Sequence, residues 1–133
     1  KNGVLTGYNT DYYGMKALFE RIKVNPKNKK AIILGTGGTS KTATAVLKDL
    51  EINEIIKVSI NNEPGTITYD EIDNHLDANI IVNTTPVGMY PKNEGLIIDI
   101  NKFNNLKFSL FSIKASPFLS FMCYHARHYI YSI

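Results

Sequence analysis

The alternation of hydrophobic and polar positions predicts two amphipathic helices in the first half of the chain. Each segment carries apolar residues at intervals of three and four, the spacing of one helical face. These residues are Met15, Leu18, Phe19 and Ile22 in the first segment and Ala43, Val46, Leu47 and Leu50 in the second. Thr10 or Asp11 can cap the first helix, and Pro26 lies beyond its end. Both helices therefore have one face that needs a partner.

Three segments predict strands. The first, at 31–34, lies between the two helices and is fully apolar, as a buried parallel strand should be. The other two, at 55–60 and 79–84, follow the second helix. A polar turn with Pro64 and Gly65 leads into a short predicted helix at 69–76. Strands that alternate with helices in this order are typical of βαβ units, in which helices cover a parallel sheet. The predicted fold class is α/β.

The last third of the chain gives a weaker pattern. We expect an extended piece at 95–100 and a strand at 107–113. Residues 116–131 are interpreted as a helix capped by Ser116, with Pro117 in its first turn. His125 and His128 would then lie three residues apart on that helix, but no third ligand accompanies them, so we predict no metal site.

Composition narrows the class of protein. The length of 133 residues suits one domain, and the net charge of +3 comes from scattered lysines, so we expect no nucleic-acid partner. Cys123 is the single cysteine, which fits a reducing compartment. No stretch approaches the roughly 20 apolar residues of a membrane span, and the N-terminal residues do not resemble a signal peptide. We therefore expect a cytoplasmic protein with no membrane partner.

The stretch "ILGTGGTSKT" at 33–42 is the densest chemical signal. Gly35, Gly37 and Gly38 stand where a strand ends and a helix begins, as in the G-x-G-x-x-G/A loop that cradles a dinucleotide pyrophosphate, with Ser40 at the sixth position. A nucleotide-hydrolysing P-loop is the rival, because Gly35 and Lys41-Thr42 fit its spacing, although Ser40 replaces its second glycine. A tight turn without any ligand is the third reading.

Two further blocks narrow these alternatives. "GYNTDYYGMKALF" at 7–19 and "NTTPVGMYP" at 83–91 flank the glycine loop, and the three together closely resemble shikimate dehydrogenase. That resemblance covers about residues 3–99. It implies a Rossmann-like NADP-binding domain, a parallel sheet with helices on both faces, at 10–133, preceded by a remnant of a substrate domain at 1–9. It also implies NADPH-dependent reduction of 3-dehydroshikimate to shikimate, a small-molecule substrate, in aromatic amino-acid synthesis.

The resemblance also assigns roles to residues. Asp11 would be the catalytic acid/base, with Asn9 and Thr10 beside it at the substrate. The family's catalytic lysine and most of its substrate-binding residues lie upstream of the part of the family that this sequence resembles, so we expect this chain alone to show weak cofactor binding and little catalysis. The expected cofactor-binding residues are Gly35, Thr36, Gly37, Gly38, Thr39, Ser59, Asn61, Asn62, Thr84, Thr85, Pro86, Val87, Gly88, Met89 and Ile113.

Two departures from the family pattern stand out. The stretch "VSINNEPG" at 58–65 lacks the arginine that clamps the 2′-phosphate of NADP, and Glu63 comes slightly late to bind a ribose as the acid of NAD enzymes does. NADP remains the expected cofactor. The tail also diverges, because Ser112 and Ala115 replace the aspartate and tyrosine of a family block near the substrate.

Overall fold

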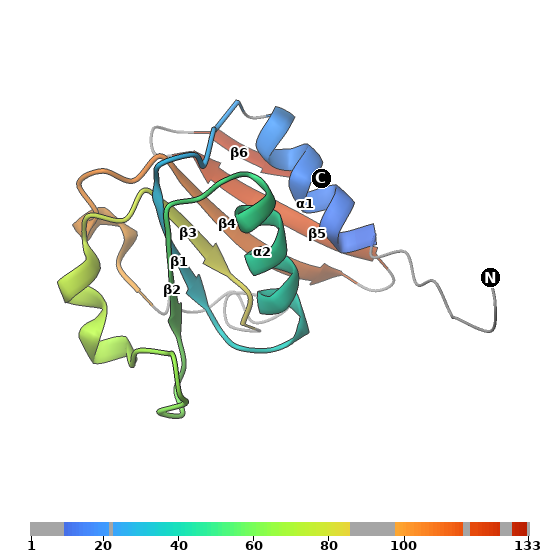
Figure 1. The fold of residues 1–133 in the computed structure, drawn as a ribbon. Coiled ribbons are helices and arrows are strands. Elements are labelled where there is room, and N and C mark those ends of the chain that lie inside the picture. Colours follow the sequence, from blue (N-terminus) through green and yellow to red (C-terminus); the bar gives the residue numbers. More distant parts are fainter. Residues whose placement is uncertain (1–9, 22, 86–97, 116–117, 126–128, 133) are drawn as a thin grey trace, which may run out of the picture.

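A computed structural model describes residues 10–21, 23–85, 98–115, 118–125 and 129–132 of the chain (Figure 1). Within those residues, six strands form one sheet in the order β2-β1-β3-β4-β5-β6. The strands are β1 (Lys30–Leu34), β2 (Glu54–Val58), β3 (Ile80–Asn83), β4 (Phe108–Ala115), β5 (Phe118–His125) and β6 (Tyr129–Ser132). The helices are α1 (Thr10–Arg21), α2 (Gly38–Asp49) and the 3-10 helices η1 (Tyr69–His75) and η2 (Ile100–Lys102).

The first four strands of this order are parallel. β1 pairs with β2 on one side and with β3 on the other, and β3 pairs with β4, all in parallel register. β5 and β6 then extend the sheet in antiparallel fashion. All four parallel strands therefore end at one common edge, and the glycine loop follows β1 at that edge.

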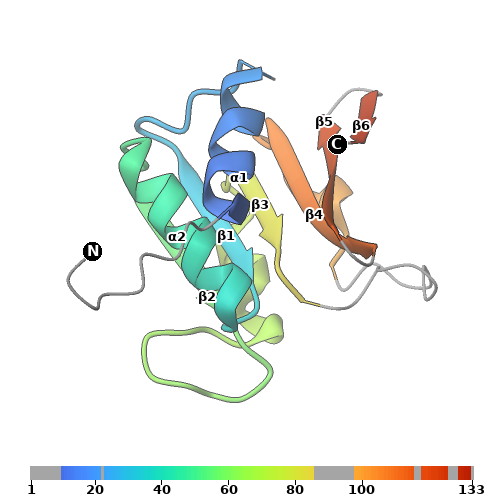
Figure 2. The ribbon, with the colours of Figure 1, turned by 90° about the vertical axis from the view of Figure 1, so that its right-hand side faces the viewer.

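Alternate residues of β1 pack into two separate cores. Ala31 and Ile33 face α1 and α2, which lie along one side of the sheet (Figure 2). Ile32 and Leu34 face the other side, where η1 and the segment around η2 cover the sheet. All four side chains are fully buried. A strand buried on both faces needs a continuous apolar sequence, which explains the run at 31–34.

The structure confirms the predicted α/β class and the order of its elements. The described residues of the predicted helical faces pack together: Met15, Leu18 and Phe19 of α1 lie against Val46 and Leu47 of α2 in one core. Leu50 is partly buried against it, and Ile22 lies outside the described residues. The predicted strands are present, with bounds shifted by one or two residues at their ends. The short helix expected at 69–76 is present as η1, and Thr68 and Glu71 form a capping box at its start.

The predicted helix at 116–131 is wrong. The structure has β5 and β6 there, and the chain pairs with β4 over eight residues, from Phe108 opposite His125 to Ala115 opposite Phe118. Without this pairing, one edge of β4 would present free main-chain donors and acceptors, and the hairpin satisfies them. His125 therefore lies on a strand, and His128 lies outside the described residues.

The expected extended piece at 95–100 ends one residue earlier than expected, because Asp99 is extended but Ile100 is not. Ile100 begins η2, and Asp99 caps that helix by accepting a hydrogen bond from the main-chain N–H of Asn101, at 3.0 Å. Residues 95–97 lie outside the described part of the chain. The strand expected at 107–113 is confirmed as β4.

Candidate ligand site at the glycine loop

The loop between β1 and α2 is built by a glycine in a left-handed conformation. Gly35 has φ +101°, a conformation that costs other residues free energy. Its N–H donates to the carbonyl oxygen of Val58 at 2.9 Å, which ties the loop to the end of β2. Gly37 then caps α2, which begins at Gly38. The first N–H groups of α2 have no partner within the helix and carry its partial positive charge.

Two threonines from the end of β3 pack against Gly35. A Cβ added at position 35 would lie 2.7 Å from Oγ1 of Thr84 and 3.1 Å from Cγ2 of Thr85. Contacts this short do not occur between real side chains, so only glycine fits here. The structure thus brings together two segments that the sequence singled out, the glycine loop and the block that begins at Asn83.

Hydrogen bonds hold these threonines in place. Thr84 donates twice to the carbonyl oxygen of Leu34, from its N–H at 2.9 Å and from Oγ1 at 2.5 Å. Thr85 donates to Oδ1 of Asn83 from its N–H at 3.0 Å and from Oγ1 at 2.6 Å. Asn83 is 3% exposed. The end of β3 is therefore a rigid wall of the loop.

The other two loop glycines face open space. A Cβ at Gly37 or at Gly38 would meet nothing within 4 Å, and both residues are exposed. This combination fits a group that approaches the backbone from outside, such as a pyrophosphate at a helix N-terminus. Ser40, at the sixth position of the motif, is 1% exposed and its Oγ has no hydrogen-bond partner. A small buried side chain there permits the close packing of α2 on the sheet.

Glu63 joins the ends of β1 and β2. Its Oε1 accepts hydrogen bonds from Oγ1 of Thr36 at 3.2 Å and from Oγ of Ser59 at 3.0 Å. Ser59 is 4% exposed, and its Oγ also accepts from the N–H of Asn61 at 3.1 Å. The sequence placed Glu63 slightly late after β2 to bind a ribose, and the turn brings its carboxylate back to the strand ends.

An open hollow of about 430 Å³ lies beside this carboxylate. Its lining combines Thr36 and Glu63 with three lysines, of which Lys41 and Lys48 come from α2 and Lys57 from β2. The excess of positive side chains favours an anionic ligand. Lys41 is exposed on the side of α2 and contributes to this hollow rather than to the glycine loop alone.

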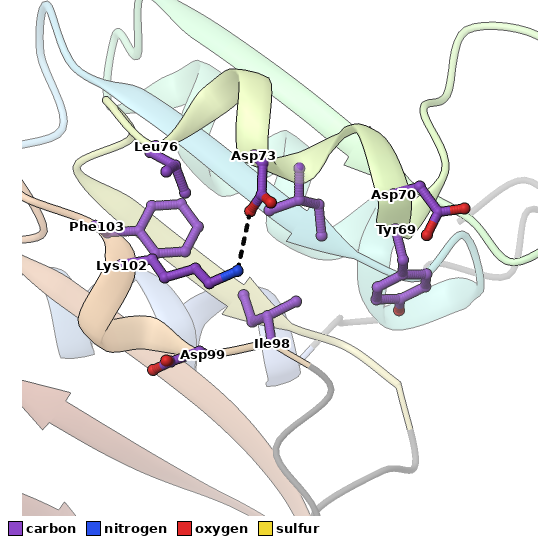
Figure 3. Close-up of a pocket in the computed structure, with 9 residues that line it drawn as sticks. Tyr69, Asp70, Asp73, Leu76, Ile98, Asp99, Lys102 and Phe103 are labelled. Carbon is purple, nitrogen blue, oxygen red and sulfur yellow. Dashed lines mark hydrogen bonds and ion pairs between the residues drawn. The ribbon is translucent and has the colours of Figure 1, made fainter.

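A second hollow, of about 270 Å³, lies on the other face of the sheet between η1 and the segment around η2 (Figure 3). Asp70, Asp73 and Asp99 line it, and Asp73 pairs with Nζ of Lys102 at 3.4 Å. Burial raises the pKa of Tyr69, which also lines it. Three carboxylates against one lysine disfavour a phosphate-bearing ligand, so the first hollow is the better candidate. Among the described residues, no group of His, Cys, Asp and Glu is placed to hold a metal ion.

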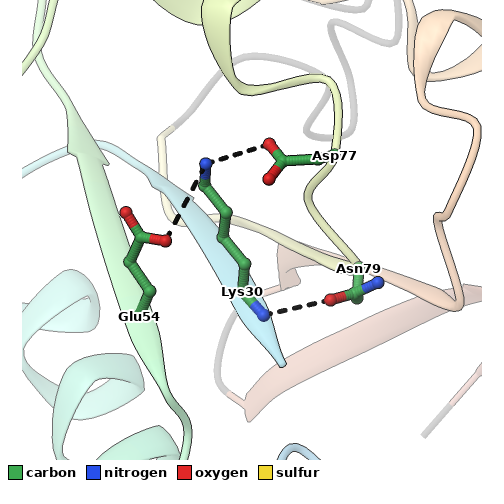
Figure 4. A network of polar contacts seen from close by, with 4 residues as sticks. All are labelled: Lys30, Glu54, Asp77 and Asn79. Carbon is green, nitrogen blue, oxygen red and sulfur yellow. Dashed lines mark hydrogen bonds and ion pairs between the residues drawn. The ribbon is translucent and has the colours of Figure 1, made fainter. Parts of the chain in front are cut away.

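The amino edge of the sheet, opposite the glycine loop, is held by a polar network around Lys30 (Figure 4). Nζ of Lys30 lies 2.9 Å from Oδ1 of Asp77 and 3.9 Å from Oε2 of Glu54. The N–H of Lys30 donates to Oδ1 of Asn79 at 3.1 Å. These contacts join the starts of β1, β2 and β3 and serve the scaffold.

The remaining predicted site residues are placed only in part. Thr10 and Asp11 belong to the first turn of α1, and Ile113 lies in β4, but the structure describes only their backbone. The hydroxyl of Tyr12 donates to Asp49, in the last turn of α2 at the opposite end from the glycine loop. Thr39 is half-buried in the first turn of α2, and Asn61 and Asn62 are exposed after β2. Asn9, Pro86, Val87, Gly88 and Met89 lie outside the described residues.

Comparisons with known proteins agree with this architecture. The chain is 33% identical to the NADP(+) shikimate dehydrogenase of Clostridium perfringens strain 13, over 77% of this chain and 43% of that protein. It is 36% identical to the enzyme of the same name from Methanosphaera stadtmanae, over 71% of this chain and 39% of that protein.

A solved chorismate mutase/shikimate 5-dehydrogenase fusion protein from Clostridium acetobutylicum is 32% identical, with a TM-score of 0.71 over 79% of this chain and 41% of that chain. The chain is a homologue of the shikimate dehydrogenases. A further similar structure is shikimate dehydrogenase 1 of Peptoclostridium difficile, at 35% identity and a TM-score of 0.66, over 76% of this chain and 38% of that one.

The chain spans less than half the length of the shikimate dehydrogenases it matches. No family model matches it. None of the described helices is long and apolar enough to cross a membrane. The comparisons therefore confirm the resemblance to shikimate dehydrogenases and the Rossmann-like fold.

Proposed function

We propose that this chain is the NADP(H)-binding part of an oxidoreductase that reduces 3-dehydroshikimate to shikimate with NADPH. One observation carries the proposal. Gly35 packs tightly against Thr84 and Thr85, whereas Gly37 and Gly38 face open space at the start of α2, where no side chain caps the helix. Such a loop offers its backbone to a pyrophosphate. The names of the homologues, NADP(+) shikimate dehydrogenases, supply the reaction.

The described residues would share the work of binding. The N–H groups that begin α2 would hold the pyrophosphate, and Thr84 and Thr85 would form the wall toward the nicotinamide end. When bound, the cofactor supplies the hydride. Ser59, Glu63, Lys41 and Lys57 would meet the adenosine end. The positions of these side chains near the ends of the strands and the start of α2 support these roles.

By resemblance to the homologues, and not from the position of α1 beside the far end of α2, Asp11 would hold and move the proton that the alcohol oxygen gains or loses during hydride transfer. An acid/base group is required because the carbonyl oxygen becomes a hydroxyl. Asn9, from the remnant of a substrate domain at 1–9, and Thr10, at the start of the next domain, would line the substrate beside it. A second catalytic group, the family's lysine, would come from residues that this sequence does not contain. The proposal therefore assigns cofactor binding, and little catalysis, to these 133 residues in the cytoplasm.

The rival function is nucleotide hydrolysis by a P-loop. The end of β3 supports the dehydrogenase instead, because a hydrolase needs an acidic residue there to help hold magnesium. Asn83 occupies that place, and its Oδ1 accepts hydrogen bonds from Thr85. A module that holds a nucleotide without chemistry is the second candidate, because the described contacts at the glycine loop account for binding and for no chemical step.

Titration of the purified chain with NADPH, NADH and ATP plus magnesium separates these functions. Fluorescence of the reduced nicotinamide reports binding directly, since the chain has no tryptophan to interfere. The proposal expects NADPH to bind and ATP with magnesium to compete weakly. Preference for ATP would contradict it. Shikimate oxidation by this chain alone would contradict the assignment of little catalysis.

A further inference from the structure

We propose that Glu63 recognises the 2′ position of the adenosine ribose and so lets this chain accept NAD(H) as well as NADP(H). The inference rests on the proposed function, because it concerns the same dinucleotide site. It goes further by naming the residue that sets the choice between the two cofactors. The evidence is the position of one carboxylate, its unused oxygen and the charges around it.

The position is the first argument. In a Rossmann-like sheet the adenosine ribose lies beyond the end of the second strand, next to the glycine loop. Glu63 binds Thr36 of that loop and Ser59, the residue that directly follows β2. Two hydrogen bonds from different segments fix the carboxylate at this junction. The turn that carries Glu63 is itself tied down, because Oγ1 and the N–H of Thr66 both donate to the carbonyl oxygen of Glu63, at 2.7 and 3.2 Å.

One carboxylate oxygen of Glu63, Oε2, is left to accept hydrogen bonds from a ligand. Both protein bonds end on Oε1, and within the described part of the chain no donor reaches Oε2 and no cation pairs with Glu63. An ionised carboxylate only accepts hydrogen bonds, so it needs further donors. Glu63 lines the open hollow, where a ribose diol supplies two O–H donors. A 2′-phosphate replaces one donor by negative charge and would be repelled.

Positive charge beside Glu63 lets the site accept NADP(H) as well. No arginine follows β2 to clamp a 2′-phosphate. Lys41 and Lys57 line the same hollow as Glu63 and offer positive charge to the phosphate. The site thus presents a carboxylate that can bind the 2′-hydroxyl of NAD(H). It also presents ammonium groups that can bind the 2′-phosphate of NADP(H). Opposed charges at one position produce weak discrimination rather than a strict preference.

The test uses ligands that carry only the adenosine end. Isothermal titration of the purified chain with ADP-ribose and with 2′-phospho-ADP-ribose compares the two ends without any contribution from the nicotinamide side. The decisive variant is Glu63→Gln, which keeps an oxygen acceptor for Thr36 and Ser59 and removes the charge. Glu54→Gln, at the other end of β2, is the matched control. Thermal unfolding of each variant checks that it is folded.

We expect the two ligands to bind the unmodified chain with dissociation constants within about tenfold of each other. Glu63→Gln should shift their ratio toward 2′-phospho-ADP-ribose by tenfold or more, as expected for loss of about one charged hydrogen bond. Glu54→Gln should leave the ratio unchanged. An unchanged ratio in folded Glu63→Gln would overturn the inference alone. Failure of both ligands and of NADPH to bind the unmodified chain would overturn the proposed function as well.

Discussion

Thr84 lies against Gly35 so closely that a Cβ at position 35 would stand 2.7 Å from the threonine Oγ1. The contact joins the ends of β1 and β3, and Oγ1 cannot simply turn away because it donates to the carbonyl oxygen of Leu34. The glycine loop and the end of β3 are therefore one structural unit. Its geometry allows the stability of the loop to be separated from its capacity to bind a ligand.

Gly35→Ala should destabilise the chain. The substitution combines a left-handed backbone at φ +101° with the clash against Thr84, and we expect a loss of roughly 2–4 kcal/mol in the free energy of unfolding. Urea unfolding measures it. Gly14→Ala is the control, because Gly14 lies inside α1 with nothing within 4 Å of a Cβ, and it should stabilise the chain by about 0.5–1 kcal/mol. Equal effects of the two substitutions would refute this picture of the loop.

Ser40→Ala should leave stability unchanged or raise it. The Ser40 hydroxyl is buried and has no partner, so its removal relieves a desolvation cost of about 1 kcal/mol, and alanine also favours the helix. Ser59→Ala is the matched comparison. Ser59 is equally buried but donates to Glu63, and its removal should cost about 1 kcal/mol. Chemical unfolding of both variants gives the comparison, and a larger loss for Ser40→Ala would contradict the assignment.

Acid should weaken the amino edge of the sheet. The hydrogen bond from Lys30 lowers the pKa of the Asp77 carboxyl below its ordinary value of 3.8. A lowered folded-state pKa contributes stability above the unfolded-state value, and this contribution disappears as the pH falls through the folded-state pKa. The carboxyl is 64% exposed, so Asp77→Asn should cost only about 0.5 kcal/mol at neutral pH.

Unfolding of Asp77→Asn at neutral and at acidic pH tests this pair. The difference between the variant and the unmodified chain should vanish once Asp77 is protonated, and it should also vanish at neutral pH in a Lys30→Gln background. A cost that persists at low pH would show that the side chain acts through packing instead.

The centre of the parallel sheet was predictable because β1 and β3 are buried on both faces. The residues at 31–34 and 80–82 are continuously apolar, and the glycines mark the turn that follows β1. The tail was not predictable in this way. Residues 118–125 carry no alternation that separates a strand from a helix, and the Ser-Pro pair at 116–117 resembles a helix start. What decides the outcome is the free edge of β4, which is a property of the assembled sheet.

In the candidate site, too, local sequence predicts some features, whereas others depend on how distant segments fold together. The glycine motif is local, and its conformation at Gly35 follows from its sequence. The position of Glu63 at the strand ends could not be predicted from the sequence, because it depends on how the turn at 61–66 folds back. Thr66 holds this turn by donating twice to the carbonyl oxygen of Glu63. Counting residues after a strand cannot reveal that return.

Binding of NADPH by the unmodified chain and by Gly38→Ala tests the central claim most directly. A Cβ at Gly38 meets no protein atom within 4 Å, so stability should be unchanged or slightly higher. The same Cβ would occupy the space where a pyrophosphate approaches the start of α2. We predict that the unmodified chain binds NADPH and that Gly38→Ala binds it at least about tenfold more weakly, with no loss in unfolding midpoint. Equal NADPH affinity of the two folded proteins would contradict the account.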